Sequence, residues 1–522
     1  MYAATTALTH PDRLAFIMAS SGESMSYHTL DQRSNRLAHL LRAQGLQRLG
    51  HYAVFMENNS RFIEACMAGE RTGLYYTCIN AYLKADELAY ILNNSESRLL
   101  VTSAALLDVA RQALPHCPGV ALCLVVGGGA AVAGTVGAAQ VLDYETAVAG
   151  LPGTPVADEW LGTAMLYSSG TTGRPKGILR PLPENPPSQP LPLFNFLNKL
   201  WQCEDGMRYL SPAPLYHSAP LANVSLALRN GGTVVIMEHF DPEQYLALVA
   251  QHRITHTQLV PTMFSRLLKL PADVQDRADV SSLKIAVHAA APCPAQVKQQ
   301  MIDWWGPIIH EYYGATEGLG FTACNTPEWL AHRGTVGRVL LGDLQVLDEM
   351  MQPVANGTPG EIWFKTASPF VYFNDPERTA LTRSADGSMS TVGDMGYLDG
   401  DGFLYLTDRS TFMIISGGVN IYPQECENLL ITHPKVADAA VFGVPNPDLG
   451  EEVKAVVQPV PGVEPGPALA QELMAFCEQH LSRQKCPRSV DFSDQLPRLP
   501  TGKLYKRLLR DPYWAGHKSR IV

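Results

Sequence analysis

Short apolar runs alternate with longer stretches of helical periodicity along most of the chain. Thr233–Met237 and Lys284–His288 are typical of buried strands, whereas Ser34–Ala43 and Pro242–His252 repeat apolar residues at the spacing of one helix face. Strands that alternate with helices build a sheet covered by helices on its faces. We therefore predict an α/β fold.

The composition is that of a globular protein with sizeable cores. Of its 522 residues, 46% are hydrophobic and 17% charged, and the formal net charge is −10 at pH 7. This acidic balance argues against a nucleic-acid-binding protein, which normally carries excess basic residues. The ten cysteines show no Cys-x-x-Cys and no Cys/His metal spacing, so we expect reduced thiols, no zinc site and a cytoplasmic protein.

One uncharged segment, Gly119–Leu142, is long enough to cross a bilayer. Its glycines interrupt the pattern, and only Val120–Val126 is continuous enough for a buried strand. We expect no transmembrane span here and no signal peptide, because the N-terminus lacks a basic start and an apolar core. Gly127–Gly129 indicates a dinucleotide site only weakly, since the third glycine of Gly-x-Gly-x-x-Gly is missing.

The pattern changes character near residue 410. Beyond it, Pro423–His433 predicts a helix, Ala437–Val444 a strand and Ala468–Leu481 a second helix, enough for a separate core. We predict a large N-terminal α/β domain, residues 1–410, and a small mobile α+β domain, residues 411–522.

Residues 167–177 read Tyr-Ser-Ser-Gly-Thr-Thr-Gly-Arg-Pro-Lys-Gly and follow the apolar run Thr163–Leu166, which predicts a buried strand. Glycines let backbone N–H groups approach a ligand, hydroxyls add donors and a lysine adds charge, so the string suits a triphosphate. It differs from a Walker A loop, which ends in Gly-Lys-Ser/Thr. The plain alternative is a polar surface loop. The candidate phosphate-binding residues are Ser168, Ser169, Gly170, Thr171, Thr172, Gly173 and Lys176.

Three further strings carry side chains that a nucleotide site needs. Tyr312–Glu317 combines an aromatic ring with a threonine and a carboxylate, which suit a base, a phosphate and Mg²⁺. Asp394 and Arg409 offer an acceptor and donors for ribose hydroxyls. Pro500–Lys503 ends in a lysine that can stabilise two anions approaching each other. Each string also has a plain structural interpretation, as a turn or a solvated charge.

In this order, the strings resemble the motifs of the AMP-forming adenylating enzymes: acyl-CoA synthetases, peptide-synthetase adenylation domains and beetle luciferase. The resemblance spans essentially the whole chain. It implies that Tyr313 stacks on adenine, Thr316 contacts the α-phosphate and Glu317 holds Mg²⁺. It also implies that Asp394 and Arg409 bind ribose.

The remaining roles follow from the same resemblance. Lys503 would bridge the carboxylate and the α-phosphate during adenylation and then leave with the small domain. Gly418 would face the pantetheine tunnel of coenzyme A. His217, in Pro-Leu-Tyr-His, would position the acid or admit the thiol, although a packing role is an equal alternative. Ala291 lies in a stretch, 289–292, that lines the adenine and acyl pockets of relatives.

The chain departs from the family pattern at several positions. Thr411 stands where relatives carry Asp or Lys at the domain hinge, and Val419 replaces a common glutamate. Ala289 and Ala290 stand where relatives usually have two glycines. The added methyl groups would reshape the acyl pocket, so a straight long-chain tunnel is not assumed.

We therefore expect an acid–thiol ligase that uses ATP, Mg²⁺ and coenzyme A to convert a carboxylic acid into acyl-AMP and then a thioester. Pro214–Leu221 and Glu328–His332 are similar to stretches of bile-acid and steroid-acid CoA ligases. A medium- or long-chain fatty acid, and hence a role in lipid metabolism, is an equal alternative, with aryl acids behind.

Two alternatives to this function stay open. The acceptor could be a carrier protein instead of coenzyme A, although no carrier domain follows Lys503. The chain could also be a non-catalytic nucleotide sensor with the same fold, against which the intact Glu317, Asp394 and Lys503 argue. A homodimer is possible for such a protein.

Overall fold

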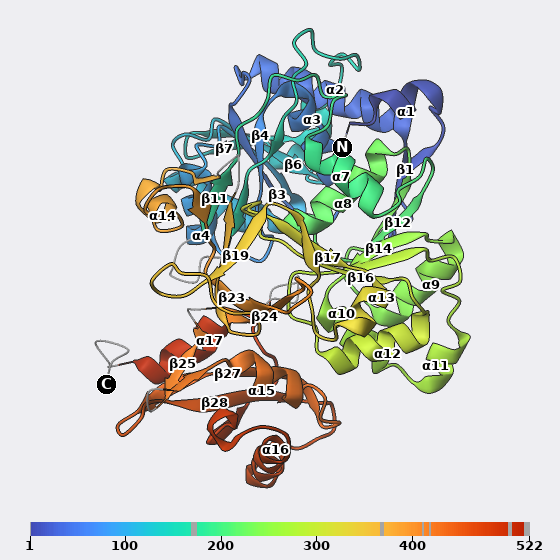
Figure 1. Ribbon diagram of the computed structural model, residues 1–522. Coiled ribbons are helices and arrows are strands. Elements are labelled where there is room, and N and C mark those ends of the chain that lie inside the picture. Colours follow the sequence, from blue (N-terminus) through green and yellow to red (C-terminus); the bar gives the residue numbers. More distant parts are fainter. Residues whose placement is uncertain are drawn as a thin grey trace. The chain divides into compact units, whose positions relative to one another are not determined.

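The computed structural model describes residues 2–168, 175–365, 370–409, 412–416, 419–498 and 504–515. Its strands and helices alternate in a mixed α/β architecture (Figure 1), as predicted. The chain divides into two compact units. The first comprises Met1–Gln258, Pro271–Ala286 and Pro369–Leu381, and the second comprises Leu259–Leu270, Val287–Ser368 and Thr382–Val522.

The first unit contains a seven-stranded, mostly parallel sheet in the order β7-β8-β6-β5-β3-β4-β9. Its strands are β3 (His51–Phe55), β4 (Tyr75–Cys78), β5 (Leu99–Ser103), β6 (Leu122–Val126), β7 (Gly134–Val136), β8 (Ala139–Asp143) and β9 (Thr163–Ala164). The helices of this region are α2 (Tyr27–Ala43), α3 (Ser60–Thr72), α4 (Ala85–Asn94), α5 (Leu107–Ala113) and α6 (Tyr144–Val148).

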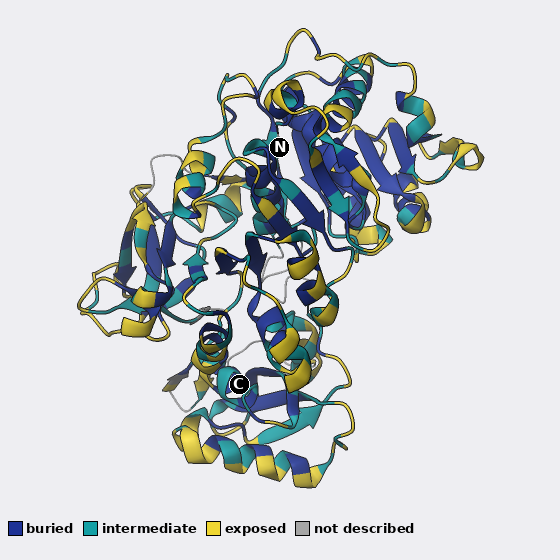
Figure 2. Ribbon diagram, turned by 90° about the vertical axis from the view of Figure 1, so that its right-hand side faces the viewer, coloured by how far each residue is buried: buried dark blue, intermediate teal, exposed yellow. Residues whose placement is uncertain are grey.

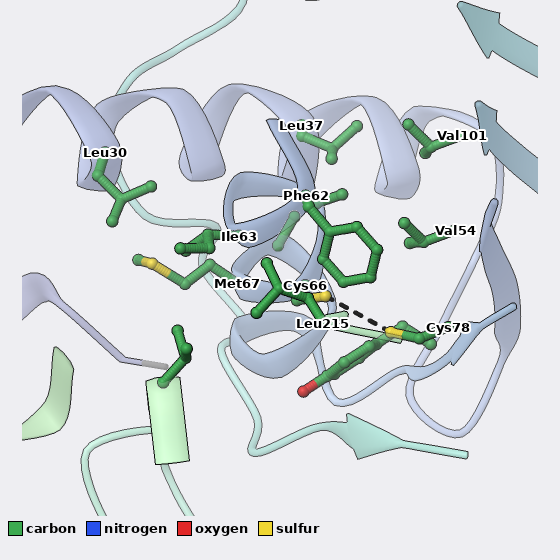
Figure 3. Close-up of a cluster of buried hydrophobic side chains, with 14 of the residues drawn as sticks. Leu30, Leu37, Val54, Phe62, Ile63, Cys66, Met67, Cys78, Val101 and Leu215 are labelled. Atoms are coloured by element: carbon green, nitrogen blue, oxygen red, sulfur yellow. Dashed lines mark hydrogen bonds between the residues drawn. The ribbon is translucent and has the colours of Figure 1, made fainter. Parts of the chain in front are cut away.

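Both faces of this sheet are buried (Figure 2), because alternate residues of its strands join different cores. Along β3, Tyr52 and Val54 belong to one hydrophobic cluster, whereas Ala53 and Phe55 belong to the other. Figure 3 shows the first cluster, in which the Sγ atoms of Cys66 and Cys78 lie 3.7 Å apart.

The uncharged segment of the sequence forms part of this sheet. β6 confirms the strand predicted within Val120–Val126, and among the described residues no helix is long and apolar enough to cross a membrane. The backbone N–H of Gly129 donates to the Asp143 carboxylate at 2.9 Å. The same carboxylate caps α6 through the Thr146 N–H, so the glycine cluster is used within the chain.

The part of the second sheet that lies in the first unit has the order β14-β12-β13-β1-β2. Its strands are β1 (Leu14–Met18), β2 (Ser24–Ser26), β12 (Arg208–Ser211), β13 (Thr233–Ile236) and β14 (His256–Leu259), and the helices between them are α8 (Ser218–Arg229) and α9 (Pro242–His252). A small third sheet joins β10 (Leu166–Ser168), β11 (Lys176–Leu179) and β21 (Val371–Tyr372).

The run Thr163–Leu166 is divided between two of these sheets, which differs from the single strand predicted. β9 pairs with β4 in parallel, whereas β10 pairs with β11 antiparallel. Met165, fully buried, lies between them. The chain changes sheets at this residue, so one apolar run serves two sheets.

Two sets of strands lie in the second unit ahead of its C-terminal part. The first set, in the order β18-β17-β16-β15, contains β15 (Ile285–His288), β16 (Ile309–Tyr313), β17 (Phe321–Cys324) and β18 (Arg338–Leu341), with helices α10 (Pro261–Leu268), α12 (Ala295–Trp305) and α13 (Thr326–Ala331). The other is antiparallel in the order β19-β20-β23-β24 and contains β19 (Asp343–Leu347), β20 (Gly360–Lys365), β23 (Asp394–Leu398) and β24 (Leu404–Arg409), with β22 (Met389–Ser390) beside β20.

The C-terminal part of this unit has its own cores on both faces of a further sheet. Its elements are β25 (Ile414–Ser416), β26 (Val419–Ile421), α15 (Pro423–Leu430), β27 (Val436–Asn446), β28 (Gly450–Pro459), α16 (Pro467–His480), β29 (Ser489–Phe492) and α17 (Lys506–Arg510). The predicted helix and strand order is confirmed. α15 ends before His433 because Pro434 disfavours helical backbone at the residue preceding it.

Candidate functional site

The predicted phosphate-binding string lies between two paired strands of the first unit. β10 and β11 are antiparallel, with Ser168 opposite Lys176, so the string connects the two strands of a hairpin. Ser168 and Lys176 are therefore brought together. The other candidates, Ser169, Gly170, Thr171, Thr172 and Gly173, lie outside the described residues.

Helix α4 holds the base of this hairpin. The Tyr167 hydroxyl donates to the Asn94 side-chain oxygen at 2.6 Å, and the Tyr90 hydroxyl donates to the Pro175 carbonyl at 3.2 Å. A Cβ on Gly177 would lie 2.9 Å from the Tyr167 ring, so a side chain at this position would displace that ring. The Lys176 ammonium lies 4.7 Å from the centre of the Tyr372 ring.

Tyr313 and Asp394 meet in the second unit. Tyr313 ends β16 and Asp394 begins β23, and the Tyr313 hydroxyl donates to the Asp394 carboxylate at 2.8 Å. Asp394 is buried and lies directly opposite Arg409 in the β23–β24 pairing. A side-chain hydrogen bond thus connects the predicted base-binding residue to Asp394, and strand pairing brings the backbone of Asp394 beside that of Arg409. The Arg409 side chain is outside the description.

A turn follows β16 and carries the other two predicted residues of this motif. The Gly318 N–H donates to the Ala315 carbonyl at 2.9 Å, and Gly318 has φ +72°, a conformation that favours glycine. Thr316 and Glu317 occupy the turn and are half-buried, so both residues are partly accessible to solvent.

A buried ion pair, not predicted from the sequence, connects α12 to β16. Lys298 of α12 and Glu311 of β16 are both buried, with their Nζ and Oε2 atoms 2.6 Å apart. Burial raises the pKa of Glu311, and the Lys298 ammonium opposes that shift. The Lys298 ammonium also lies 4.9 Å from the centre of the buried Trp329 ring. His288 is 3.4 Å from the same carboxylate, and burial lowers its pKa well below the usual range.

Trp329 and His332 therefore have structural partners. The Nδ1 of His332 donates to the Asp399 carboxylate at 2.9 Å, and the His332 ring stacks on Phe403 with ring centres 3.8 Å apart. Trp329 and His332 of the stretch Glu328–His332, which is similar to bile-acid CoA ligases, thus pack against other residues of the second unit.

The alanine stretch connects β15 to α12. Ala290 has φ +74°, a left-handed conformation that costs an alanine more than a glycine, and it is exposed. Ala289 is buried and Ala291 half-buried. Ala290 thus has a backbone conformation that favours glycine, although an alanine stands where relatives usually have a glycine.

His217 is the N-cap residue of α8 in the first unit. Its backbone N–H donates to the Pro214 carbonyl at 3.3 Å, closing a tight turn, and its ring lies 4.3 Å from that of Tyr216. The structure brings His217 to the carboxyl end of β12. This is the edge at which α/β sheets bind ligands.

In the C-terminal part, strand pairing joins the residues on either side of two further motifs. Ser416 pairs with Val419, leaving Gly418 between β25 and β26, and Arg498 pairs with Leu504 around the segment that contains Lys503. Lys506 forms a buried ion pair with Glu427 at 2.8 Å. Gly418, Lys503 and the predicted hinge residue Thr411 lie outside the described residues, so their roles stay predictions, as does the domain boundary at 410/411.

Comparison with known proteins identifies the family. The chain matches the model of the AMP-binding enzyme family over residues 3–371 and that of the AMP-binding enzyme C-terminal domain over residues 425–503. A feruloyl-CoA synthase from Amycolatopsis sp. is 32% identical over 506 residues, which cover 94% of each chain. The structure of ATP-bound MatB from Rhodopseudomonas palustris has a TM-score of 0.79 and 27% identity, covering 98% of this chain and 99% of that one.

A third relative has a bicyclic substrate in its name. The 3-[(3aS,4S,7aS)-7a-methyl-1,5-dioxo-octahydro-1H-inden-4-yl]propanoyl:CoA ligase from Rhodococcus jostii is 32% identical over 510 residues, which cover 95% of each chain. The chain belongs to the AMP-binding enzyme family, as an AMP-forming acyl-CoA synthetase of the adenylate-forming superfamily. It has the large N-terminal and smaller C-terminal parts of that fold.

Proposed function

We propose that this protein condenses a ring-bearing hydrophobic carboxylic acid with ATP to acyl-AMP and pyrophosphate, and then transfers the acyl group to coenzyme A. The observation that supports the nucleotide site best is the Tyr313–Asp394 hydrogen bond beside the Asp394–Arg409 strand pairing. A carboxylate fixed in this way can accept hydrogen bonds from two adjacent ribose hydroxyls.

The chain's own groups divide the adenylation step between them. Lys176 and the hydroxyls of the β10–β11 hairpin would bind the phosphates, and Thr316 would contact the α-phosphate. Lys503 would stabilise the substrate carboxylate and the phosphoryl oxygens as the carboxylate oxygen bonds to the α-phosphorus and pyrophosphate leaves. Catalysis is then positioning and charge stabilisation without a protein nucleophile.

Glu317 fits a Mg²⁺ ion that arrives with ATP. Among the described residues, no three His, Cys, Asp or Glu side chains gather as a metal site. A single carboxylate suffices for Mg²⁺, which usually completes its octahedron with phosphate oxygens and water. When bound, the ion would neutralise charge on the phosphates. Glu317, half-buried in its turn, would hold it.

The second half-reaction relies on the small domain. In our proposal, residues 411–522 rotate near Thr411, Lys503 leaves the site and Gly418 lines the path of the coenzyme A thiol. His217 would position the acid or admit the thiol. We place the reaction in the cytoplasm and leave room for a homodimer.

Ring-bearing acids are supported by the named relatives and by the alanine stretch. Two relatives at 32% identity act on an aromatic acid and on a bicyclic acid by their names. The methyl groups at Ala289 and Ala290 would shorten or reshape a straight acyl tunnel. A long-chain-fatty-acid–CoA ligase of Mycobacterium tuberculosis at 28% identity keeps a fatty acid as the second candidate.

The test is AMP release that depends on ATP, coenzyme A and an acid. The panel would contain ferulate, benzoate, cholate, a steroid side-chain acid, octanoate and palmitate. We expect a ring-bearing acid to give the highest kcat/KM. Palmitate as the best substrate would favour the fatty-acid candidate, and turnover only with a pantetheinylated carrier protein would replace coenzyme A as the acceptor.

Lys503→Ala should abolish acid-dependent pyrophosphate exchange. The matched control is Lys485→Ala, which removes another lysine of the C-terminal part, one paired with Glu425 at 2.5 Å on the surface. Nucleotide binding without pyrophosphate exchange for every acid would support the sensor interpretation and contradict the proposal.

A further inference from the structure

The side chain of Asn58 joins three backbone positions of the first unit. Its Nδ2 donates to the carbonyls of Ala213 at 3.2 Å and Met237 at 2.9 Å, and its Oδ1 accepts from the Leu215 N–H at 2.8 Å. Only 6% of Asn58 is exposed. All three hydrogen bonds are therefore formed away from water, where their loss would leave unpaired polar groups.

These positions belong to two different sheets. Asn58 follows β3 of the seven-stranded sheet, whereas Ala213 follows β12 and Met237 follows β13 of the second sheet. One amide thus connects the carboxyl edges of both sheets. This is the edge at which ligands of α/β proteins bind.

Two of the three hydrogen bonds fix the segment that leads into His217. Asn58 holds the backbone at Ala213 and Leu215, on either side of Pro214, whose carbonyl accepts the His217 N–H. Tyr216, in the same turn, is 5% exposed and packs its ring against His217. The position of His217 is therefore set by a side chain far away in the sequence.

No other residue supplies this combination of groups in the same volume. Aspartate keeps the acceptor for Leu215 but turns two donors into an acceptor that faces two carbonyls, and leucine has no polar group. The neighbouring Asn59 has a different task. It caps α3 by accepting from the Arg61 N–H at 2.9 Å, a task that serine also performs without placing a second carboxylate beside Glu57, to which the Asn59 amide donates at 3.2 Å.

We propose that Asn58 is a positioning residue for the acid substrate, acting through the turn that carries His217. This inference rests on the proposed function, in which His217 lies at the acyl carboxylate. Asn58 has no contact with the substrate in this proposal. It keeps the backbone of 213–217 in the geometry that binds the acid.

The experiment compares Asn58→Asp, Asn58→Ser and the matched control Asn59→Ser with the wild type, using the best acid of the panel. We expect both Asn58 variants to raise the KM for the acid about tenfold while the KM for ATP changes less than about twofold. Asn59→Ser should change neither. KM does not depend on the fraction of folded enzyme, so partial misfolding does not obscure the result.

Three outcomes would overturn the inference. An unchanged KM for the acid, with only a lower melting temperature or less active enzyme, would give Asn58 a purely structural role. An equal rise of the KM for ATP would mean general distortion, and failure of both variants to fold would again mean structure alone. Failure of the proposed function itself is recognised separately, because the wild type would then turn over no acid.

Discussion

The Tyr313 hydroxyl donates a hydrogen bond to the Asp394 carboxylate across 2.8 Å, joining the last residue of one strand to the first residue of another. The two side chains come from different sheets of the second unit. One of them is the residue expected at adenine and the other the residue expected at ribose. Their contact would join the two halves of the proposed nucleoside site.

Removal of the Tyr313 hydroxyl should weaken ATP binding. Tyr313→Phe leaves the ring but frees the Asp394 carboxylate, and a hydrogen bond to a charged group contributes about 1.5–3 kcal/mol, so we expect the KM for ATP to rise about tenfold or more. The KM for the acid should stay within about twofold. Steady-state kinetics with each substrate varied in turn measures both values.

The control for this change is Tyr397→Phe on the same strand as Asp394. Tyr397 stacks on Tyr405 with ring centres 4.8 Å apart, and loss of its hydroxyl should leave the KM for ATP unchanged. An unaltered KM for ATP in Tyr313→Phe would show that Asp394 holds its position without the tyrosine.

The buried Lys298–Glu311 pair should make a large contribution to stability that depends on both partners. Lys298→Met leaves a buried carboxylate unpaired, for which we expect a loss of about 3–5 kcal/mol in the free energy of unfolding. The double variant Lys298→Met, Glu311→Leu should be clearly more stable than Lys298→Met alone. Denaturant unfolding of the wild type, the single variants Lys298→Met and Glu311→Leu, and the double variant measures the coupling.

The exposed pair Arg277–Asp273, with side chains 75% and 71% exposed, supplies the control. Its removal should cost less than about 1 kcal/mol, because water screens exposed charges. Equal losses for the two pairs would mean that burial does not strengthen the interaction of Lys298 with Glu311.

His310 should make the fold sensitive to mild acid. Burial, together with the charge of Lys298, lowers its pKa from 6.5 to about 4, so the native state binds fewer protons than the unfolded state between these values. Above pH 6.5 the histidine is neutral in both states and does not lower the free energy of unfolding. As the pH falls from 6.5 toward 4, the free energy of unfolding decreases by at most about 3 kcal/mol. Melting temperatures of the wild type across this pH range should fall accordingly.

His310→Gln should flatten that part of the pH profile, whereas replacement of the exposed His10 by Gln should leave it unchanged. A profile of His310→Gln parallel to that of the wild type would assign the acid sensitivity to other groups.

Ala290 stores backbone strain that glycine would relieve. A left-handed alanine costs about 1–2 kcal/mol, and part of the gain is offset by the greater freedom of glycine in the unfolded chain, so Ala290→Gly should stabilise the protein by about 0.5 kcal/mol. Ala289→Gly, at a buried position without left-handed backbone, should instead destabilise it by about 1 kcal/mol. Thermal unfolding of both variants measures the two changes in stability. A loss of stability in Ala290→Gly would contradict the inference that the backbone at Ala290 is strained.

The strand and helix predictions succeeded where a local pattern decides the structure. Pro242–His252 is a helix with the predicted bounds, and Thr233–Ile236 and Ile285–His288 are the strands expected within one residue. The prediction of a single strand over Thr163–Leu166 was wrong. The chain changes sheets at Met165 because β9 pairs with β4 and β10 pairs with β11, and both partner strands lie elsewhere in the sequence. Periodicity carries no information about which sheet a strand will join.

In the candidate site, too, some residues could be predicted from local motifs and others only from the tertiary structure. Ser168, Lys176, Tyr313 and Asp394 could be named from the sequence because their motifs are short and chemically specific. Asn58, Lys298 and Glu311 could not, since an asparagine near a strand end and single charges within a helix and a strand are ordinary in any chain. Their importance arises from burial and from partners that only the fold provides.

The sequence by itself determined the class of the enzyme, because a phosphate-binding string and a Tyr-Gly-x-Thr-Glu string are local arrangements that a few consecutive residues specify. The tertiary structure alone decided that Tyr313 reaches Asp394, and that Asn58 holds a turn whose farthest hydrogen-bond partner is 179 residues away along the chain. Such contacts form when sheets and helices pack, and the cost of closing long loops is met by burial of the whole core rather than by any local pattern.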